Sequence, residues 1–198
     1  MYTAPGELRE VLRGLPTKHL AGKAARFRCG VGPADPAAAT KFALRSVARR
    51  YRALSEEIAE LDARIERLAR EAAPALVALD GVGPDTAAAL LIAAGDNPDR
   101  LRSEASFAHL CGAAPVQASS GKVLRHRLNP GGNRDANRAL HVVALNRMRR
   151  NPRTRGYVAR RTTEGKSKRE AMRCLKRYIA RETYRAILLD AGTRLPPG

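Results

Sequence analysis

Residues 119–127 hold the side chains whose types and spacing could do covalent chemistry on a phosphodiester. The segment reads Ser119-Ser120-Gly121-Lys122 and continues to Arg125-His126-Arg127. A serine hydroxyl is a poor nucleophile unless a neighbouring group takes its proton or stabilises the attacked group. Guanidinium groups could neutralise a phosphate as it becomes pentacoordinate, and His126 is near Ser120 in sequence, which does not establish it as a base. On composition alone, Ser120 is interpreted as an ordinary loop serine.

The charge of the chain is concentrated in its last third. The 198 residues carry 37 Lys or Arg against 19 Asp or Glu, a net charge of +18. Residues 121–185 hold twenty of the basic residues and four acids, a net charge of +16. A charge this uneven predicts a polyanionic partner, and we expect nucleic acid. A membrane surface is disfavoured because the basic segments lack a Trp- and Phe-rich apolar face.

The last predicted helix, from about Ser167 to Asp190, carries an arginine at every fourth position from Arg169 to Arg185. Like charges at this spacing repel one another by a few tenths of a kcal/mol per pair. Phosphates, or acids from a neighbouring element, would relieve the repulsion, and a solvated face is the alternative. The residues expected to bind nucleic acid are Gly81, Gly83, Lys122, Arg125, Arg127, Arg134, Arg138, Arg169, Arg173, Lys176, Arg177 and Arg181.

The cysteines and the N-terminus predict a cytoplasmic, soluble protein. Cys29, Cys111 and Cys174 are far apart and form neither a metal-ligand spacing nor a disulfide framework, so we expect reduced core thiols. The N-terminus has no apolar signal core. The longest apolar run, residues 87–94, is far shorter than the ~18 residues that span a bilayer.

A long helix is predicted from Asp35-Pro36, a favourable cap and first position, to about Ala73 before Pro74. Its apolar positions follow a strict heptad spacing, which predicts a coiled coil. The same pattern fits a long bundle helix, and it does not say whether the partner is a second copy or a helix of this chain. The seam positions are Leu44, Val47, Tyr51, Leu54, Ile58, Leu61, Ile65 and Leu68.

Residues 76–95 have the pattern of a helix-hairpin-helix, with a Gly-Val-Gly turn between two helices. Gly81 and Gly83 permit positive φ in a tight turn, and Pro84 opens the second helix. Its first N–H groups could hold a phosphate oxygen without reading sequence. A turn between two core helices is the alternative, and Asp80 and Asp85 disfavour phosphate binding.

The rest of the chain completes a mainly α fold. Short helices are expected over residues 1–33, which could also be a linker, and over 103–111. Residues 113–130 lack helical periodicity and predict a hairpin or an ordered loop, with Val116-Gln117 and Val123-Leu124 flanking the serines. Helices are expected from Asn133 to Arg150, with Leu140, Val143 and Ala144 buried, and from Pro152 to Arg161. The predicted domains are therefore 1–33, a coiled-coil helix over 34–73, and a helical domain over 74–198 with basic helices in 133–190.

The motifs taken together resemble a known family over about residues 8–190. They are LDGVGPDTAAALLIAAGDNPDRLRSEASFAHLCGAAPVQASSG, HRLNPGGNRDANRALHVVALNRMR, TRGYVARR and KREAMRCLKRYIARE. The chain resembles the C-terminal part of a transposase of the insertion-sequence one-ten family, also called one-sixteen and nine-oh-two. Members resemble one another in having a RuvC-like nuclease domain with acidic residues, a coiled coil, and a transposase domain with a catalytic serine.

The resemblance implies DNA recombination directed by a structured guide RNA, with Ser120 as the catalytic serine, because it stands before Gly121 and follows Gly112-Ala-Ala-Pro115. The four acidic residues that should hold Mg²⁺ in the nuclease domain have no counterpart before Asp35, where only Glu7 and Glu10 occur. No cofactor is therefore expected in this chain. We expect a truncated copy, an excised part or one half of a split enzyme, which binds DNA but does not transpose it alone.

Two other functions stay open. The chain could be a non-catalytic helix-hairpin-helix module for nucleic acid. It could also be an oligomerisation or regulatory protein that pairs with itself or with a transposase subunit through the heptads.

Overall fold

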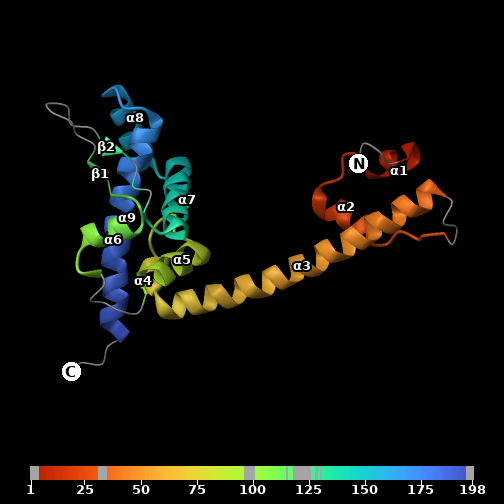
Figure 1. Ribbon diagram of the computed structural model, residues 1–198, viewed down its shortest axis with the longest axis horizontal. Coiled ribbons are helices and arrows are strands. Elements are labelled where there is room, and N and C mark those ends of the chain that lie inside the picture. Colours follow the sequence, from red (N-terminus) through yellow and green to blue (C-terminus); the bar gives the residue numbers. More distant parts are fainter. Residues whose placement is uncertain are drawn as a thin grey trace. The chain divides into compact units, whose positions relative to one another are not determined.

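The computed structural model describes residues 5–30, 35–95, 101–114, 116–117, 126–127, 129 and 131–194. The chain is mainly α-helical, as the sequence predicts (Figure 1). Its internal contacts divide it into two units, Met1–Ala63 and Arg64–Gly198. The division falls within the long helix α3 (Pro36–Ala72).

The first unit packs two short helices, α1 (Gly6–Leu12) and α2 (Thr17–Ala24), with the beginning of α3. Its small core is built largely from alanines of α2 and α3, including Ala21, Ala24 and Ala48, with Leu44 and Phe27 against them. Arg45 on α3 donates a 3.4 Å hydrogen bond to the Phe27 carbonyl. Residues 1–33, which the sequence left open as a linker, therefore include two helices in their described part, of which α2 packs on α3.

The long helix begins and ends as expected. The Asp35 carboxylate accepts hydrogen bonds from the backbone N–H groups of Ala37 and Ala38, at 2.9 and 3.2 Å. It thereby satisfies two of the donors that a helix start leaves unpaired. At the other end, Ala73 leaves helical conformation (φ −148°), and Pro74 opens the next helix.

The heptad seam of α3 is largely uncovered by the described residues. Leu54 is 47% exposed, Ile58 57% and Leu61 48%. Leu44, which packs against the small core, and Ile65 are half-buried, so the seam is covered in part near its two ends. The bundle-helix alternative predicts that a second helix of the same unit covers these side chains, and no described residue of the first unit does so.

The second unit contains six helices and one strand pair in its described part. After the end of α3 come α4 (Pro74–Val77), α5 (Pro84–Ala94), α6 (Glu104–Leu110), β1 (Val116–Gln117), β2 (His126–Arg127), α7 (Arg134–Arg150), α8 (Pro152–Thr163) and α9 (Lys168–Arg194). The helix α8 ends two residues beyond the expected Arg161, and α9 continues past the expected Asp190. Helices α6, α7 and α8 begin where the sequence predicts.

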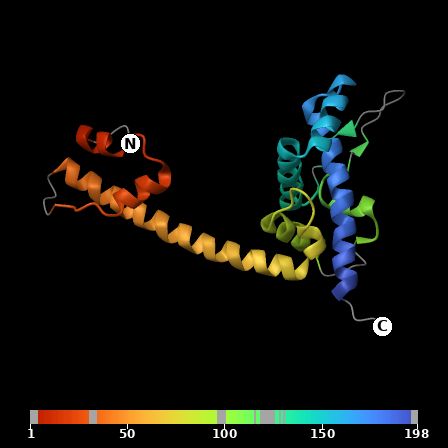
Figure 2. The ribbon, with the colours of Figure 1, turned by 180° about the vertical axis from the view of Figure 1, so that it is seen from behind.

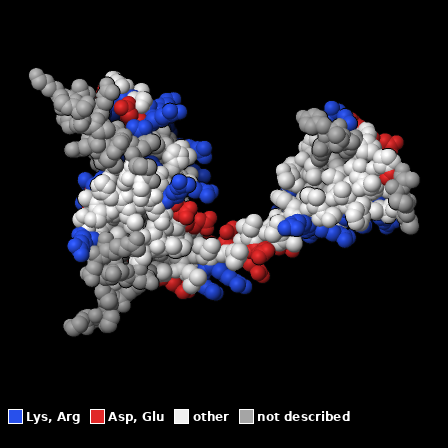
Figure 3. All heavy atoms as spheres, in the orientation of Figure 1, with Lys and Arg blue, Asp and Glu red and all other residues white. Residues whose placement is uncertain are grey.

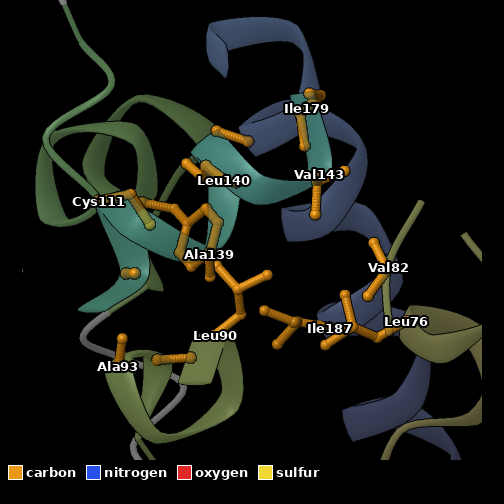
Figure 4. Close-up of a cluster of buried hydrophobic side chains, with 14 of the residues drawn as sticks. Leu76, Val82, Leu90, Ala93, Cys111, Ala139, Leu140, Val143, Ile179 and Ile187 are labelled. Atoms are coloured by element: carbon orange, nitrogen blue, oxygen red, sulfur yellow. The ribbon is translucent and has the colours of Figure 1, made fainter. Parts of the chain in front are cut away.

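Helix α9 is the centre of the second unit, because α4, α6, α7 and α8 all contact it. Figures 1 and 2 show α7 on one side of α9 and the strand pair on the other. Side chains of α4, α5, α7 and α9 meet in one core, which includes Leu76, Leu90, Leu140 and Ile179 (Figure 4). Each fully buried aliphatic side chain of this size stabilises the fold by about 1.5–3 kcal/mol. As predicted, Leu140, Val143 and Ala144 form the buried side of α7.

Polar side chains hold the helix starts in this unit. Ser103 accepts from Ser106 N, Asn133 accepts from two N–H groups at the start of α7, and Asn151 accepts from Thr154 N. The start of α4 is capped instead by a residue that is distant in the sequence. The buried Asp190 carboxylate on α9 accepts from Ala75 N and Leu76 N, at 2.9 and 3.0 Å. This contact joins the start of α4 to the C-terminal part of α9.

Candidate nucleic-acid interface

The predicted serine segment joins the two short strands. β1 and β2 pair antiparallel, with Val116 opposite Arg127 and Gln117 opposite His126. The expected hairpin is therefore present, with its second described strand at residues 126–127 rather than at Val123-Leu124. Ser119, Ser120, Lys122 and Arg125, together with residues 123–124, lie outside the described residues, and Arg127 is described by its backbone alone.

The base of this hairpin is held closed by the end of α6 and the start of α7. Asn133 N donates to the Leu110 carbonyl at 2.6 Å, and the Asn129 side chain donates to the His109 carbonyl at 3.2 Å. Asn137 on α7 donates to the Cys111 carbonyl at 2.8 Å. These bonds satisfy carbonyl groups that the end of a helix leaves without partners.

Two glycines allow this close approach. Gly112 has φ +61°, a conformation that favours glycine. A Cβ on Gly132 would lie against the Gly112 nitrogen and 2.5 Å from its Cα. Any side chain at residue 132 would therefore separate the two ends of the segment that carries Ser120.

Lys176, expected at the nucleic-acid surface, lies beside this hairpin base instead. Its Nζ donates a 2.6 Å hydrogen bond to Asn137 Oδ1, and the side chain is half-buried. Burial is the main reason that its pKa is lowered. Its amine holds Asn137 while Asn137 holds Cys111, so this lysine has a structural role that the helix pattern did not reveal.

The cysteines are only partly the core thiols that the sequence predicts. All three are free; Cys111 is buried, whereas Cys29 and Cys174 are half-buried. Burial raises the pKa of the Cys111 thiol to about 12. Since the thiolate is the reactive form, Cys111 is chemically inert near neutral pH.

The Gly-Val-Gly turn packs against α7. Gly81 has φ +76°, and a Cβ there would lie 3.3 Å from the Val143 carbonyl oxygen and 3.2 Å from Arg147 Cγ. Gly83 has φ −95°, so the positive φ expected at both glycines occurs only at Gly81. The Gly83 N–H donates to the Thr86 hydroxyl at 2.8 Å. These contacts give the turn a packing role, which fits the alternative that it is a turn between two core helices. Phosphate binding by Gly81 and Gly83 stays a prediction.

Arg147 is a buried charged residue that the sequence did not single out. It is 7% exposed. Its Nε donates to the Asp80 carbonyl at 2.7 Å, and its Nη1 pairs with Glu182 on α9 at 2.6 Å. Asn151 donates to the Asp80 carboxylate at 2.7 Å. Arg147 thus connects the glycine turn, α7 and α9. The carboxylate of Asp80, beside the turn, is held by the side-chain amide of Asn151.

The arginine stripe of α9 divides into two groups. Arg177 and Arg181 both contact Glu104 on α6, each at 2.8 Å. The hydrogen bond from Arg181 is the largest cause of the lowered pKa of Glu104. An acid from a neighbouring element therefore relieves the charge repulsion at these two positions. The other predicted α9 contacts, Arg169 and Arg173, are exposed.

Lys and Arg side chains gather along an edge of the second unit in Figure 3, on the side where Figure 1 places α7 and α8. Arg134 and Arg138 lie on the solvent-exposed side of α7, as predicted, and His141, about one turn further on, is exposed as well. The exposed arginines of these two helices, which we call the α7–α8 basic face, are Arg134, Arg138, Arg149, Arg150, Arg153, Arg155 and Arg160. Such a density of cations suits the phosphates of a nucleic-acid backbone.

Two further observations concern the described part of the chain. None of its helices is long and apolar enough to cross a membrane. Its His, Cys, Asp and Glu side chains do not gather in threes at any place that could hold a metal ion.

Residues 73–159 match the model of the transposase IS116/IS110/IS902 family. This part of the chain is similar to the transposase domain of that family.

Two curated relatives extend the similarity beyond the domain. The insertion element IS110 uncharacterized 43.6 kDa protein of Streptomyces coelicolor is 35% identical over 159 residues, which cover 77% of this chain and 39% of that protein. The insertion element IS900 uncharacterized 42 kDa protein of Mycobacterium paratuberculosis is 32% identical over 158 residues, with 78% and 39% covered. The chain therefore spans about two fifths of the length of the relatives it matches.

The matched residues run from the start of α4 into α8 and include Ser120 between the two strands. Helix α9 lies beyond the matched residues, although Ile179 and Ile187 of this helix belong to the same core. The domain as matched therefore needs α9 to bury its apolar surface.

Proposed function

We propose that this chain is the DNA-binding, serine-bearing part of an insertion-sequence transposase. Transposases act on DNA, and the transposase domain carries the α7–α8 basic face. That exposed face, on a domain of this family, is the observation that carries the proposal. The arginines of this face contact phosphates and position the duplex without reading its sequence.

A salt titration of DNA binding tests this proposal. Each phosphate neutralised on B-DNA contributes about 0.9 to the slope of log affinity against log salt. The double substitution R134Q/R138Q should therefore weaken binding of a duplex and lower the slope by about 1.8. The control R49Q/R50Q removes two exposed arginines from α3 and should change the slope less. Equal slopes for the wild type and R134Q/R138Q would refute the assignment of this face.

The proposed chemistry assigns the nucleophile to Ser120. The Ser120 hydroxyl gives up its proton as its Oγ–phosphorus bond forms, the bond from phosphorus to one deoxyribose oxygen breaks, and the leaving oxygen takes up a proton, so that no proton is gained or lost overall. A structured guide RNA selects the DNA. The described residues hold no group suited to Mg²⁺, so we derive no step through a metal ion on this chain. A need for Mg²⁺ would come from acidic residues of a separate nuclease domain.

Because the chain matches 39% of each relative, the chemical test supplies the unmatched part of such a relative as a second polypeptide. The assay detects a protein–DNA adduct that survives denaturation with detergent. S120A should abolish the adduct and leave duplex affinity unchanged, whereas S119A should retain it. An adduct of normal yield with S120A would assign the chemistry elsewhere. Recombination or nicking by this chain alone with Mg²⁺ would contradict the need for a second part.

A second candidate function, self-association through α3, is favoured by the exposed heptad seam. Leu54, Ile58 and Leu61 expose about half of their surfaces, and a parallel or antiparallel copy would bury them. L54D/L61D should abolish self-association in sedimentation velocity. The control A53D/A63D places the same two charges on exposed positions outside the seam and should not. Unchanged sedimentation of L54D/L61D would remove this function.

A further inference from the structure

Two tyrosines meet where α8 packs against α9. The ring centroids of Tyr157 and Tyr178 are 5.8 Å apart, with the ring planes at 83°, which is an edge-to-face pair. Tyr157 is half-buried, and burial is the largest cause of its raised pKa. Tyr178 is 51% exposed. Tyr157 therefore supports the Tyr178 ring from within, while about half of Tyr178 faces solvent.

Aromatic rings are few in this chain, which has five Tyr, three Phe and no Trp. In the described part of the second unit, Phe107 is buried and Tyr184 is half-buried, where its hydroxyl donates to the Leu101 carbonyl. Tyr178 is the exposed ring of that part. Burial of apolar surface accounts for the other rings but not for the exposed surface of Tyr178.

Arginines surround this tyrosine pair. Arg181 Cζ lies 5.9 Å from the centroid of Tyr178, and Arg160 and Arg161 lie 5.8 and 6.0 Å from that of Tyr157. Arg181 is held by Glu104 and Arg161 by Glu164 at 2.6 Å. These carboxylates fix the guanidinium groups beside the rings, and Arg160 remains largely exposed, with 68% of its side chain accessible.

We propose that Tyr178, supported by Tyr157 and flanked by Arg160 and Arg181, is a stacking site for an unpaired base of a single-stranded nucleic acid. An unpaired base can stack on an aromatic ring or on a guanidinium group, and the neighbouring phosphates can then contact the arginines. The bases of an intact duplex are already stacked and cannot reach the ring. The site thus binds a different form of nucleic acid from the duplex-binding basic face, and it does not depend on chemistry at Ser120.

Fluorescence anisotropy with the full chain tests the site. The probes are a 12-nucleotide oligothymidylate, its oligouridylate equivalent and a blunt 12-base-pair duplex. Y178L keeps apolar bulk but removes the ring, and it should weaken single-strand binding about tenfold while leaving duplex binding within twofold. Y178F keeps the ring and should bind all three probes as the wild type does. Because Tyr178 is exposed, the thermal midpoint of Y178L should stay close to that of the wild type.

The outcomes separate this proposal from the proposed function. Loss of affinity for both single strands with Y178L supports a stacking site, and a loss confined to one of them names DNA or RNA as its ligand. Single-strand affinity within twofold of the wild type overturns it. An equal loss for the duplex also overturns it and assigns Tyr178 to the phosphate-binding surface. R134Q/R138Q tests duplex binding independently of all these results.

Photo-crosslinking gives a second readout that a folding defect cannot imitate. An oligothymidylate with one 5-iodouracil should crosslink to the tryptic peptide Tyr178–Arg181, because cleavage follows Arg177 and Arg181. Mass spectrometry identifies the adduct. A crosslink that maps only to α3 or to unit one would contradict the assignment even if Y178L weakened binding.

Discussion

Replacing Arg147 by Met tests whether a single buried side chain holds the glycine turn, α7 and α9 together. Met fills a similar volume but can form neither the bond to the Asp80 carbonyl nor the ion pair with Glu182. The loss of a charge-assisted hydrogen bond, with the carbonyl left unpaired, costs about 2 kcal/mol. Glu182 is 47% exposed, so the ion pair adds no more than about 1 kcal/mol.

The expected total is about 3 kcal/mol. The second unit spans 135 residues, a size at which 1 kcal/mol shifts the melting temperature by about 3–4 °C. R147M should therefore melt about 10 °C below the wild type in circular dichroism. The control R149M changes a neighbouring arginine that is exposed, and it should melt within about 2 °C of the wild type. Equal melting temperatures for R147M and R149M would refute the reasoning.

Three further predictions follow from other contacts. G132A should lower the melting temperature by several degrees, because its Cβ meets the Gly112 backbone, whereas G131A, whose Cβ would meet only a side-chain oxygen at 3.5 Å, should be tolerated. The pKa of Glu104 is lowered from 4.5 by its arginine partners, so its stabilising contribution is present above pH 4.5 and is lost as the pH falls through the lowered value. The melting temperatures of E104Q and the wild type should thus differ at pH 7 and converge toward pH 3, and a constant difference would contradict the ion-pair account. Iodoacetamide at pH 8 should label the two half-buried cysteines of the native chain before Cys111, and mass spectrometry that finds Cys111 labelled first would contradict its burial.

Local signals in the sequence predicted most of the secondary structure. Asp35, Ser103 and Asn133 each cap the helix that follows them, and Asp35-Pro36 and Pro74 predicted the two ends of α3. These predictions succeed because a capping residue and an apolar period act within one or two turns of the chain. The solvent-exposed and buried sides of α7 follow from the same short-range apolar periodicity.

Contacts between distant residues could not be read in this way. The periodicity of α9 placed Arg177 and Arg181 on one stripe but could not indicate that Glu104, more than seventy residues earlier, would pair with both. Lys176 is predicted to bind nucleic acid, but the sequence could not indicate that it would donate a hydrogen bond to Asn137 on α7. Arg147 looked like any other arginine of a basic helix, since its burial depends on the packing of α7 against α9.

The central claim, that DNA lies on the α7–α8 basic face, is tested most directly by arginine footprinting. The full chain is treated with an arginine-specific glyoxal reagent with and without duplex DNA, and the modified sites are located by mass spectrometry. The account predicts that DNA protects Arg134 and Arg138 on α7 and leaves Arg49 and Arg50 on α3 reactive. Protection of the α3 arginines alone, with Arg134 and Arg138 as reactive as in the unbound chain, would contradict it.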